Sequence, residues 1–413
     1  MLKIYVCGPT VYNEPHIGNL RPIITFDFML KAYRELNKEF KFVHNITDVD
    51  DKIINKAIQM DVKESEVASF YFKSYQKLLR MLNVNTISKI EKVTKNMNVI
   101  NKYIEKLYLS ENAYKDENGN VWFDVLKNNE NYGHVSNQNI DNMVFDENSL
   151  LKRFKGDFAL WKSTAVGIKF RSSFGMGRPG WHTECSALID KHFGSDGVDI
   201  HGGGMDLTFP HHENENIQHY ALYKKQLAKE WIRCGQLNLD GEKMSKSVGN
   251  VILANDFING YGIATLKLIF LNAKVSANIN ITNELIENMK AIENKYKKVL
   301  FKIFVHYKNE ILNMNDYNKS EFVTKALEAV SELEFSDFNF MLNNEIKQFN
   351  KEPSLDRAKD LFFLLSLFHK ELTNKSFYSK HLEIYDQWRY FIGIKDYKKA
   401  DKLREKLIKN SLI

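Results

Sequence analysis

The first part of the chain has two short apolar segments with a helical pattern of hydrophobic positions between them. Residues 2–7 and 41–46 are short apolar runs typical of buried strands, and Gly8-Pro9 ends the first of them. Between the two runs, residues 21–36 place apolar side chains on one face of a helix. This strand–helix–strand order predicts a parallel sheet, whose ligand site lies at the carboxyl ends of the strands.

The pattern changes twice farther along the chain. Residues 82–154 are rich in Asn, Lys and Asp and show weak periodicity, which predicts an insertion into the sheet domain. Strand signals return at residues 197–200, so the sheet domain is split in the sequence. After about residue 282, amphipathic helices are predicted at residues 283–304, 320–333, 355–372 and 380–391.

These patterns predict an α/β fold in which a parallel-sheet domain with an insertion is followed by an all-α domain. The expected halves of the sheet domain are residues 1–81 and 155–230, separated by the insertion at 82–154. Residues 231–281 are expected to form a region with a phosphate-binding loop, and residues 282–413 the helical domain.

The composition is that of an ordinary globular protein. A chain of 413 residues is long enough for two to four domains, and 44% of its residues are hydrophobic. No apolar run approaches the roughly 20 residues of a membrane span, and the N-terminus lacks the charged and apolar regions of a signal peptide. We therefore expect a cytoplasmic protein that does not bind membranes.

Cysteine content and charge add two constraints. Three cysteines in a chain this long cannot form a disulfide framework, which favours a reducing compartment and leaves thiols available for metal binding or catalysis. The net charge of +6 is modest, but basic residues gather between Lys395 and Lys409, which suits a polyanionic partner. Taken by itself, such a run is more simply explained as a solvated helix face.

Residues 243–247, Lys-Met-Ser-Lys-Ser, form the most informative polar segment. They follow the turn dipeptide Asp240-Gly241 and precede Val248-Gly249, which predicts an exposed, mobile loop. Two lysines and two hydroxyls in one loop can bind a triphosphate, and the lysine charges can follow negative charge as pyrophosphate leaves. Without further support, a solvated loop explains the segment equally well.

A second segment, residues 15–19 (Pro-His-Ile-Gly-Asn), lies between the first strand and its helix. Backbone N–H groups and the helix dipole create an anion site there, and Gly18 lets a phosphate approach closely. Together with residues 243–247, this segment resembles the paired signatures of the class I aminoacyl-tRNA synthetases, His-Ile-Gly-His near the start and Lys-Met-Ser-Lys-Ser later. Asn19 departs from that pattern because it stands where the family has its second histidine. Asparagine donates a hydrogen bond but carries no positive charge, so we expect Asn19 to maintain the chemistry with altered electrostatics.

Cysteine, histidine and glutamate residues form another candidate constellation. His211 and Glu215 are four residues apart and therefore share one face of a helix, a workable spacing for metal ligands. Asn216 stands in place of the second histidine of His-Glu-x-x-His, which disfavours a metalloprotease. A shared sheet can bring Cys7 and Cys185 to the same crevice. Either cysteine alone is more simply a small buried hydrophobic residue.

Further segments resemble the signatures of the cysteinyl-tRNA synthetase family, in the family's order, at residues 5–12, 45–48, 180–185, 201–206 and 210–215. The resemblance covers the catalytic half closely and the helical domain more loosely. It implies a Rossmann-like class I catalytic domain followed by a helical tRNA-binding domain.

The resemblance also implies roles for individual residues. The implied zinc ligands are Cys7, Cys185, His211 and Glu215. The implied substrate-binding residues, in the amino-acid and ATP pockets, are Gly8, Thr47, Trp181, His201 and Asp206. The implied contacts to ATP are Thr10, His16, Gly18, Asn19, Gly203 and Lys246. The implied catalytic residues are His16, Asn19, Lys243 and Lys246.

The chemistry of this ligand set agrees with a preference for cysteine. Two thiolates, a neutral imidazole and a carboxylate leave Zn²⁺ able to accept one more soft ligand, such as the thiolate of a substrate cysteine. An apolar pocket separates close analogues by only about 10²-fold, so metal ligation makes a separate editing domain unnecessary. Cys234 has no ligand at metal spacing, and we expect it to be structural.

The sequence thus predicts a two-step ligase that forms cysteinyl-adenylate from ATP and L-cysteine and then transfers cysteine to the 3′ end of tRNA(Cys). Mg²⁺ is expected with ATP, zinc as the resident metal, and a monomer as the working form. One rival is a related ligase that joins cysteine to a small amine, which the helical domain argues against. The other is a non-catalytic RNA-binding relative, which Lys243 and Lys246 argue against.

Overall fold

The computed structural model describes residues 1–145, 151–244, 249–314 and 317–413. The described chain divides into two compact units. Unit 1 comprises Met1–Ile23, Glu39–Gln236 and Ser276–Asn278. Unit 2 comprises Ile24–Lys38, Leu237–Val275 and Ile279–Ile413.

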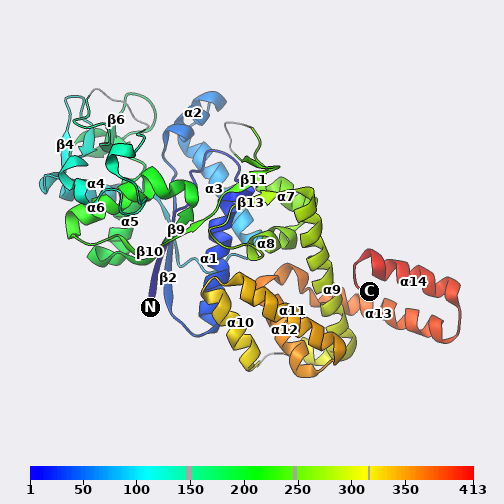
Figure 1. The fold of residues 1–413 in the computed structure, drawn as a ribbon. Coiled ribbons are helices and arrows are strands. Elements are labelled where there is room, and N and C mark those ends of the chain that lie inside the picture. Colours follow the sequence, from blue (N-terminus) through cyan, green and yellow to red (C-terminus); the bar gives the residue numbers. More distant parts are fainter. Residues whose placement is uncertain (146–150, 245–248, 315–316) are drawn as a thin grey trace. The chain divides into compact units, whose positions relative to one another are not determined.

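A parallel sheet organises unit 1, as the sequence predicted. Its strand order is β10-β9-β1-β2-β3, and the neighbouring strands described here pair in parallel. The strands are β1 (Leu2–Val6), β2 (Phe40–Ile46), β3 (Lys89–Lys92), β9 (Val198–Gly204) and β10 (Ala228–Cys234). Strand β1 therefore lies in the middle of the sheet, between β2 and β9, and its carboxyl end meets the ends of both neighbours (Figure 1).

Helices connect these strands. They are α1 (Ile17–Glu35), α2 (Asp51–Met60), α3 (Glu64–Met81), α4 (Met97–Leu109), α5 (Thr183–Phe193) and α6 (Glu213–Tyr223). Helix α2 begins where Asp50 accepts a hydrogen bond from the backbone of Lys52. Short helical turns complete the connections at η1 (Val93–Asn96), η2 (Leu126–Asn131), η3 (Ile140–Asn142), η4 (Gly194–Asp196), η5 (Met205–Leu207) and η6 (Thr208–His212).

A second sheet in unit 1 forms the insertion. Its order is β4-β5-β6-β8-β7, with antiparallel pairs, and its strands are β4 (Ala113–Lys115), β5 (Val121–Phe123), β6 (Phe158–Ser163), β7 (Phe170–Ser172) and β8 (Gly175–Pro179). Phe123, Phe158, Leu160 and Trp161 are buried in its core together with side chains of α4. Burial of these large side chains stabilises the insertion as a packed layer.

The predicted boundaries of the insertion differ from those of the two sheets. Strand β3 falls inside the predicted range 82–154, yet it pairs in parallel with β2. Strands β6 to β8 fall inside the predicted second half of the sheet domain, yet they pair with the insertion strands. Strand β3, with the sequence Lys-Ile-Glu-Lys, is a short polar edge strand that hydrophobic periodicity does not detect.

Unit 2 combines a small sheet with helices. The sheet has the order β12-β11-β13, formed by β11 (Leu237–Leu239), β12 (Glu242–Lys243) and β13 (Ile279–Ile281). The helices are α7 (Ala254–Tyr261), α8 (Ile263–Leu271), α9 (Asn283–Leu312), α10 (Glu321–Ser331), α11 (Phe335–Lys351), α12 (Leu355–Phe368), η7 (Lys370–Leu372), α13 (Lys375–Gly393) and α14 (Tyr397–Lys409). Helices α13 and α14 lie side by side at the red end of the chain (Figure 1).

Capping residues mark several helix starts in unit 2. Thr282, Ser320 and Ser354 each accept a hydrogen bond from the backbone at the start of α9, α10 and α12, respectively. The predicted helices at 283–304, 320–333, 355–372 and 380–391 therefore correspond to observed helices. Helix α11 was not predicted, although Phe338, Leu342, Ile346 and Phe349 recur at helical spacing on its buried face.

None of the helices in the described part of the chain has the length and apolar character needed to span a bilayer.

Candidate functional site

Four side chains from distant parts of the chain come together at the carboxyl end of β1. Cys7 directly follows β1, Cys185 lies in the first turn of α5, and His211 and Glu215 lie in η6 and α6. Their ligand atoms all lie within 4.8 Å of one another. The structure thus brings together the residues that the sequence predicted as metal ligands.

The distances suit a tetrahedral metal site. Cys7 Sγ lies 3.9 Å from Cys185 Sγ and 3.5 Å from His211 Nε2, and Cys185 Sγ lies 3.7 Å from the same nitrogen. Tetrahedral zinc, with bonds of about 2.3 Å to sulfur and about 2.0 Å to nitrogen, places two sulfurs about 3.8 Å apart and sulfur and nitrogen about 3.6 Å apart. Glu215 Oε1 lies 2.7 Å from His211 Nε2, at hydrogen-bond distance. The two sulfurs and the nitrogen therefore have the spacing of a zinc site, and the carboxylate completes a set of donors that suits zinc in its chemistry.

Another group has the spacing for a metal: Cys7, His201, His212 and Glu215. A histidine that binds metal through one ring nitrogen usually donates the hydrogen of the other nitrogen to an acceptor. His211 Nδ1 lies 3.1 Å from His182 Nδ1. Within the described ranges, Nδ1 of His201 and Nδ1 of His212 are buried without a hydrogen-bond partner. The group containing His211 is therefore the better metal site.

Burial and mutual charge set the protonation of this cluster. Burial raises the pKa of Cys7 well above its usual value, and the neighbouring Cys185 adds to the shift. Burial opposes ionisation of Cys185 too, but hydrogen bonds with Cys7 and His211 outweigh it and lower its pKa to about 6. Burial also opposes charge on His211, yet the Glu215 carboxylate raises the pKa of that imidazole to about 10. A metal that binds here must therefore displace protons from Cys7 and His211 at neutral pH.

The loop after β1 is held against β2 by close backbone contacts. Gly8 N donates to Asn45 Oδ1 at 2.8 Å, and a Cβ on Gly8 would lie 1.6 Å from the Asn45 carbonyl oxygen. Val11 N donates to the Thr47 carbonyl at 3.1 Å. Glycine is therefore required at position 8 because no side chain fits there, and this close approach fixes the loop that carries Cys7.

Thr47 lies under this loop, where Thr10 forms an isolated bridge with it. The Thr47 hydroxyl donates to Glu184 Oε1 at 2.5 Å, and both side chains are buried. Burial raises the pKa of Glu184 well above its usual value, and the nearby Cys185 contributes to the shift. The sequence predicted Thr47 as a substrate-binding residue but did not identify Glu184, whose carboxyl group orients the Thr47 hydroxyl.

Two predicted substrate contacts adjoin the metal cluster. His201 is fully buried, its Nε2 lies 2.6 Å from Glu215 Oε2, and its ring stacks on Trp231 with centroids 4.6 Å apart. Trp181 is 40% exposed and stacks on the ring of His211 at 4.5 Å. His201 therefore supports a candidate ligand, whereas Trp181 presents an accessible aromatic face beside the cluster.

Helix α6 is polar but buried, and its side chains anchor it to other elements. Glu213 Oε2 accepts hydrogen bonds from Val135 N and Ser136 N at 3.0 and 2.7 Å. Asn216 Oδ1 accepts one from Leu227 N at 2.9 Å, just before β10. The sequence prediction did not include these anchors. A detectable signal was the polar run His-His-Glu-Asn-Glu-Asn at 211–216, which is unsuited to an exposed amphipathic helix.

The predicted phosphate-binding residues of unit 1 surround the start of α1. Asn19 Oδ1 accepts a hydrogen bond from His16 N at 3.1 Å, and Asn19 N donates to the His16 carbonyl at 3.0 Å. His16, Gly18 and Asn19 are half-buried. Because Asn19 uses its amide oxygen for the backbone, its amide nitrogen is the group left to donate to a ligand.

The remaining predicted residues lie in several elements. Lys243 is exposed and lies in β12, which forms a hairpin with β11 through the turn at Asp240-Gly241. The sequence had predicted a loop at this position, so that prediction is wrong for Lys243. Lys246 belongs to residues 245–248, which lie outside the described part of the chain. Gly203 lies in β9, and Asp206 is exposed in η5. The catalytic, ATP-binding and substrate-binding roles of these residues stay predictions.

Comparisons with known proteins agree with this geometry. The family model described as tRNA synthetases class I (C) catalytic domain matches residues 1–291. A cysteine–tRNA ligase of Mesomycoplasma hyopneumoniae (strain 232) is 42% identical over 413 residues, covering 99% of this chain and 98% of the relative. A cysteine–tRNA ligase of Malacoplasma penetrans (strain HF-2) is 37% identical, covering 100% of this chain and 95% of the relative.

A solved structure shows that the fold is shared more widely. Methionyl-tRNA synthetase of Mycobacterium tuberculosis bound by methionyl-adenylate superposes with a TM-score of 0.64 at 12% identity. The match covers 89% of this chain and 91% of that chain. At this identity the likeness concerns the fold, and it supports the class I α/β architecture.

His182 gives a first test of the candidate metal site. Changing His182→Ala removes the acceptor for the His211 Nδ1 hydrogen, and we expect zinc affinity to fall about 10–100-fold. Affinity is measured by competition with a chromophoric chelator, and circular dichroism verifies the fold. His182→Asn, whose amide oxygen can accept the same hydrogen, should retain more affinity. His381→Ala, which changes a histidine in α13, is the control. Equal zinc affinity in the parent and His182→Ala would contradict this role.

Proposed function

This chain belongs to the cysteine–tRNA ligase family of class I tRNA synthetases, and we propose that it activates L-cysteine with ATP and transfers it to the 3′ end of tRNA(Cys). The observation that supports cysteine as the amino-acid substrate is the cluster of Cys7, Cys185, His211 and Glu215. When zinc is bound there, it offers a further position that suits a thiolate better than a serine hydroxyl.

The residues around the cluster position the amino acid. Trp181 presents an exposed ring beside His211, and the half-buried Thr10 pairs with Thr47 at the end of β2. His201 holds Oε2 of Glu215, which leaves Oε1 beside His211 Nε2 within the cluster, so the carboxylate is oriented before a metal or substrate arrives. This preorganisation supports discrimination by the first step, without a separate editing reaction.

The first step joins the amino acid to AMP. A carboxylate oxygen of cysteine attacks the α-phosphorus of ATP, an oxygen–phosphorus bond forms, and pyrophosphate leaves. His16 and Asn19 at the N-terminal end of α1 provide donors and the positive end of a helix for the phosphates. Lys243 and Lys246 provide positive charge for the departing pyrophosphate, and Mg²⁺ accompanies ATP.

The second step transfers cysteine to RNA. A ribose hydroxyl at the 3′ end attacks the acyl carbon, AMP leaves, and the hydroxyl proton passes to the phosphate or to solvent. Catalysis consists mainly of holding the reacting groups in position. The predicted cytoplasmic location and the predicted monomer stay predictions.

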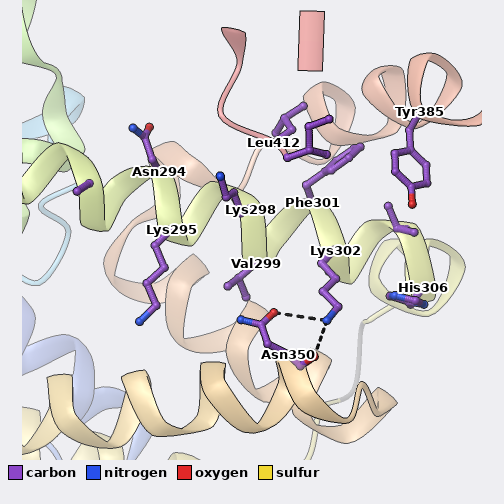
Figure 2. A pocket seen from close by; sticks show the side chains of 13 residues that line it. Asn294, Lys295, Lys298, Val299, Phe301, Lys302, His306, Asn350, Tyr385 and Leu412 are labelled. Carbon is purple, nitrogen blue, oxygen red and sulfur yellow. Dashed lines mark hydrogen bonds between the residues drawn. The ribbon is translucent and has the colours of Figure 1, made fainter. Parts of the chain in front are cut away.

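A basic cavity in unit 2 supports binding of a polyanion. It has a volume of about 690 Å³ and lies between α9, Asn350 of α11 and Tyr385 of α13. Lys295, Lys298 and Lys302 of α9 line it, and Lys302 faces Asn350 in Figure 2. These lysines fit the sequence-based expectation that the helical domain binds tRNA through its phosphates.

Cysteine-dependent ATP–pyrophosphate exchange tests the activation step. We expect exchange with L-cysteine, a preference over L-serine above about 10²-fold, and loss of exchange after treatment with a zinc chelator. Cys185→Ala should lose both exchange and bound zinc, whereas Cys234→Ala, a matched change of a buried cysteine, should keep both. No exchange under any condition would exclude the enzyme. Equal exchange with serine would exclude selection by zinc.

Asn19 tests the site for the α-phosphate. Asn19→Asp keeps an oxygen for the His16 N–H but replaces the amide donor with negative charge, so we expect exchange to fall about 10²–10³-fold with little change in thermal unfolding. Asn19→His should change exchange by less than about tenfold, because the position needs a donor more than a charge. A large gain with Asn19→His would show that Asn19 is a defect. Full activity of Asn19→Asp would show that the amide does not contact phosphate.

Lys298 tests the cavity of unit 2. It is exposed on α9, so Lys298→Glu changes charge without removing a buried contact. We expect about tenfold weaker binding of tRNA in filter-binding assays, with a smaller dependence of affinity on salt and unchanged ATP–pyrophosphate exchange. Lys370→Glu, an exposed lysine of η7 outside the cavity, is the control. Unchanged tRNA affinity with Lys298→Glu would exclude this cavity as an RNA contact.

A further inference from the structure

A buried arginine of α1 holds together two passages of the chain that are far apart in the sequence. Arg21 is 1% exposed, and its Nη1 lies 2.5 Å from the Gly235 carbonyl oxygen and 2.7 Å from the Ala277 carbonyl oxygen. A terminal guanidinium nitrogen carries two hydrogens, so this one nitrogen donates to both carbonyls. All three residues belong to unit 1.

The two passages also touch each other at this point. A Cβ on Gly235 would lie 2.2 Å from the Ala277 carbonyl oxygen, and Gln236 N donates to Asn278 Oδ1 at 2.8 Å. Glycine is needed at position 235 because a side chain there would push the passages apart. We call Gly235, Gln236, Ala277 and Asn278 the junction, which Arg21 fastens from the side of α1.

The junction is the base of the hairpin that carries Lys243. Strand β11 begins at Leu237, directly after Gln236, and β13 begins at Ile279, directly after Asn278. These two strands pair in parallel, with Leu237 opposite Ile279. Strand β11 then forms the antiparallel hairpin with β12, which contains Lys243. The position of Lys243 therefore depends on backbone that starts at the junction.

Arg21 also belongs to the helix whose start is the proposed site for the α-phosphate. It follows Asn19 by two residues in α1, and hydrogen bonds between Asn19 and His16 order the first turn of that helix. In the proposed activation step, the helix start acts on the α-phosphate and Lys243 acts on the departing pyrophosphate. Groups that act on one triphosphate need accurate placement, because an error of about 1 Å can lower a rate about 10²-fold.

We propose that Arg21 is a positioning residue for the activation step. It fixes the base of the β11–β12 hairpin, and through this base it holds Lys243 where the lysine charge stabilises the leaving pyrophosphate. Because Arg21 is buried and donates to backbone carbonyls, its charge serves to hold the chain and not to contact a phosphate. The inference rests on the proposed function and adds a residue that acts through another.

Arg21→Lys tests the proposal in ATP–pyrophosphate exchange. Lysine keeps the charge, but its shorter side chain lacks the planar fork that serves both carbonyls. We expect the KM for pyrophosphate to rise about tenfold and kcat to fall at least about tenfold, because Lys243 is displaced. The KM for L-cysteine and the bound zinc should stay within about twofold of the parent. Arg34→Lys, the same change at an exposed arginine of α1, is the matched control.

Gly235→Ala tests the junction without changing a charge. The added methyl group pushes the two passages apart, so the KM for pyrophosphate should rise as it does in Arg21→Lys. Gly260→Ala, where an added Cβ would meet no atom outside its own helix backbone within 4 Å, is the control. Active-site titration gives the fraction of active enzyme, since a loss of active molecules lowers the apparent kcat and leaves the KM for pyrophosphate unchanged. If Arg21→Lys does not fold, Gly235→Ala and Asn278→Ala decide the question.

A double-mutant cycle tests whether Arg21 acts through Lys243. In an enzyme that already carries Lys243→Ala, we expect Arg21→Lys to lower exchange by less than about twofold, although it lowers exchange at least about tenfold in the parent. Thermal unfolding midpoints verify that the single and double variants fold.

Several outcomes overturn the proposal. Equal factors in the two backgrounds would show that Arg21 acts independently of Lys243. Unchanged kinetics in both Arg21→Lys and Gly235→Ala would exclude the junction as a positioning device. Loss of zinc together with a raised KM for L-cysteine would show that Arg21 supports unit 1 in general. A parent without cysteine-dependent exchange would instead refute the proposed function, which separates the two failures.

Discussion

The buried carboxylate of Glu215 is the interaction on which the rest of the site depends. Its side chain is fully buried, one oxygen meets His211 at 2.7 Å, and the other meets His201 at 2.6 Å. An unpartnered carboxylate at such a position would cost several kcal/mol, so both histidines must be in place for the charge to be tolerated. Burial opposes its ionisation, but the two histidines lower the pKa of Glu215 well below its usual value.

The elements around Glu215 hold its carboxylate in place. Helix α6 carries Glu215, and its neighbours Glu213 and Asn216 attach the helix to backbone groups of the insertion and of the segment before β10. Strand β1 brings Cys7 to the same point because it lies in the middle of the parallel sheet. A metal centre made from such distant segments needs this rigid support, since ligand positions must agree within fractions of an ångström.

Two side chains beside the metal cluster also form part of the wall of a cavity in unit 1. Trp181 and His182 contact the candidate ligand His211 and also line this cavity of about 300 Å³, together with Lys52 and Lys162. Unit 2 has a basic cavity of its own, lined by lysines of α9, and this cavity suits the phosphates of an RNA.

The sequence by itself determined the fold class, and it predicted the candidate metal ligands that the structure brings together. Apolar runs and helical periodicity gave β1, α1 and β2, and the spacing of His211 and Glu215 placed both on one helical face, because these patterns are local. Short polar elements such as β3 were missed, because an edge strand with one buried side chain has no hydrophobic period.

Tertiary structure decided the contacts between segments far apart in the chain. No local pattern shows that His182 would meet His211, that Glu184 would hold Thr47, or that lysines of α2 and β6 would line one cavity. These contacts follow from strand order and from the packing of α5 and α6. Burial then shifted the protonation of the thiols and imidazoles, because charge in a low-dielectric interior depends on the groups that surround it in space.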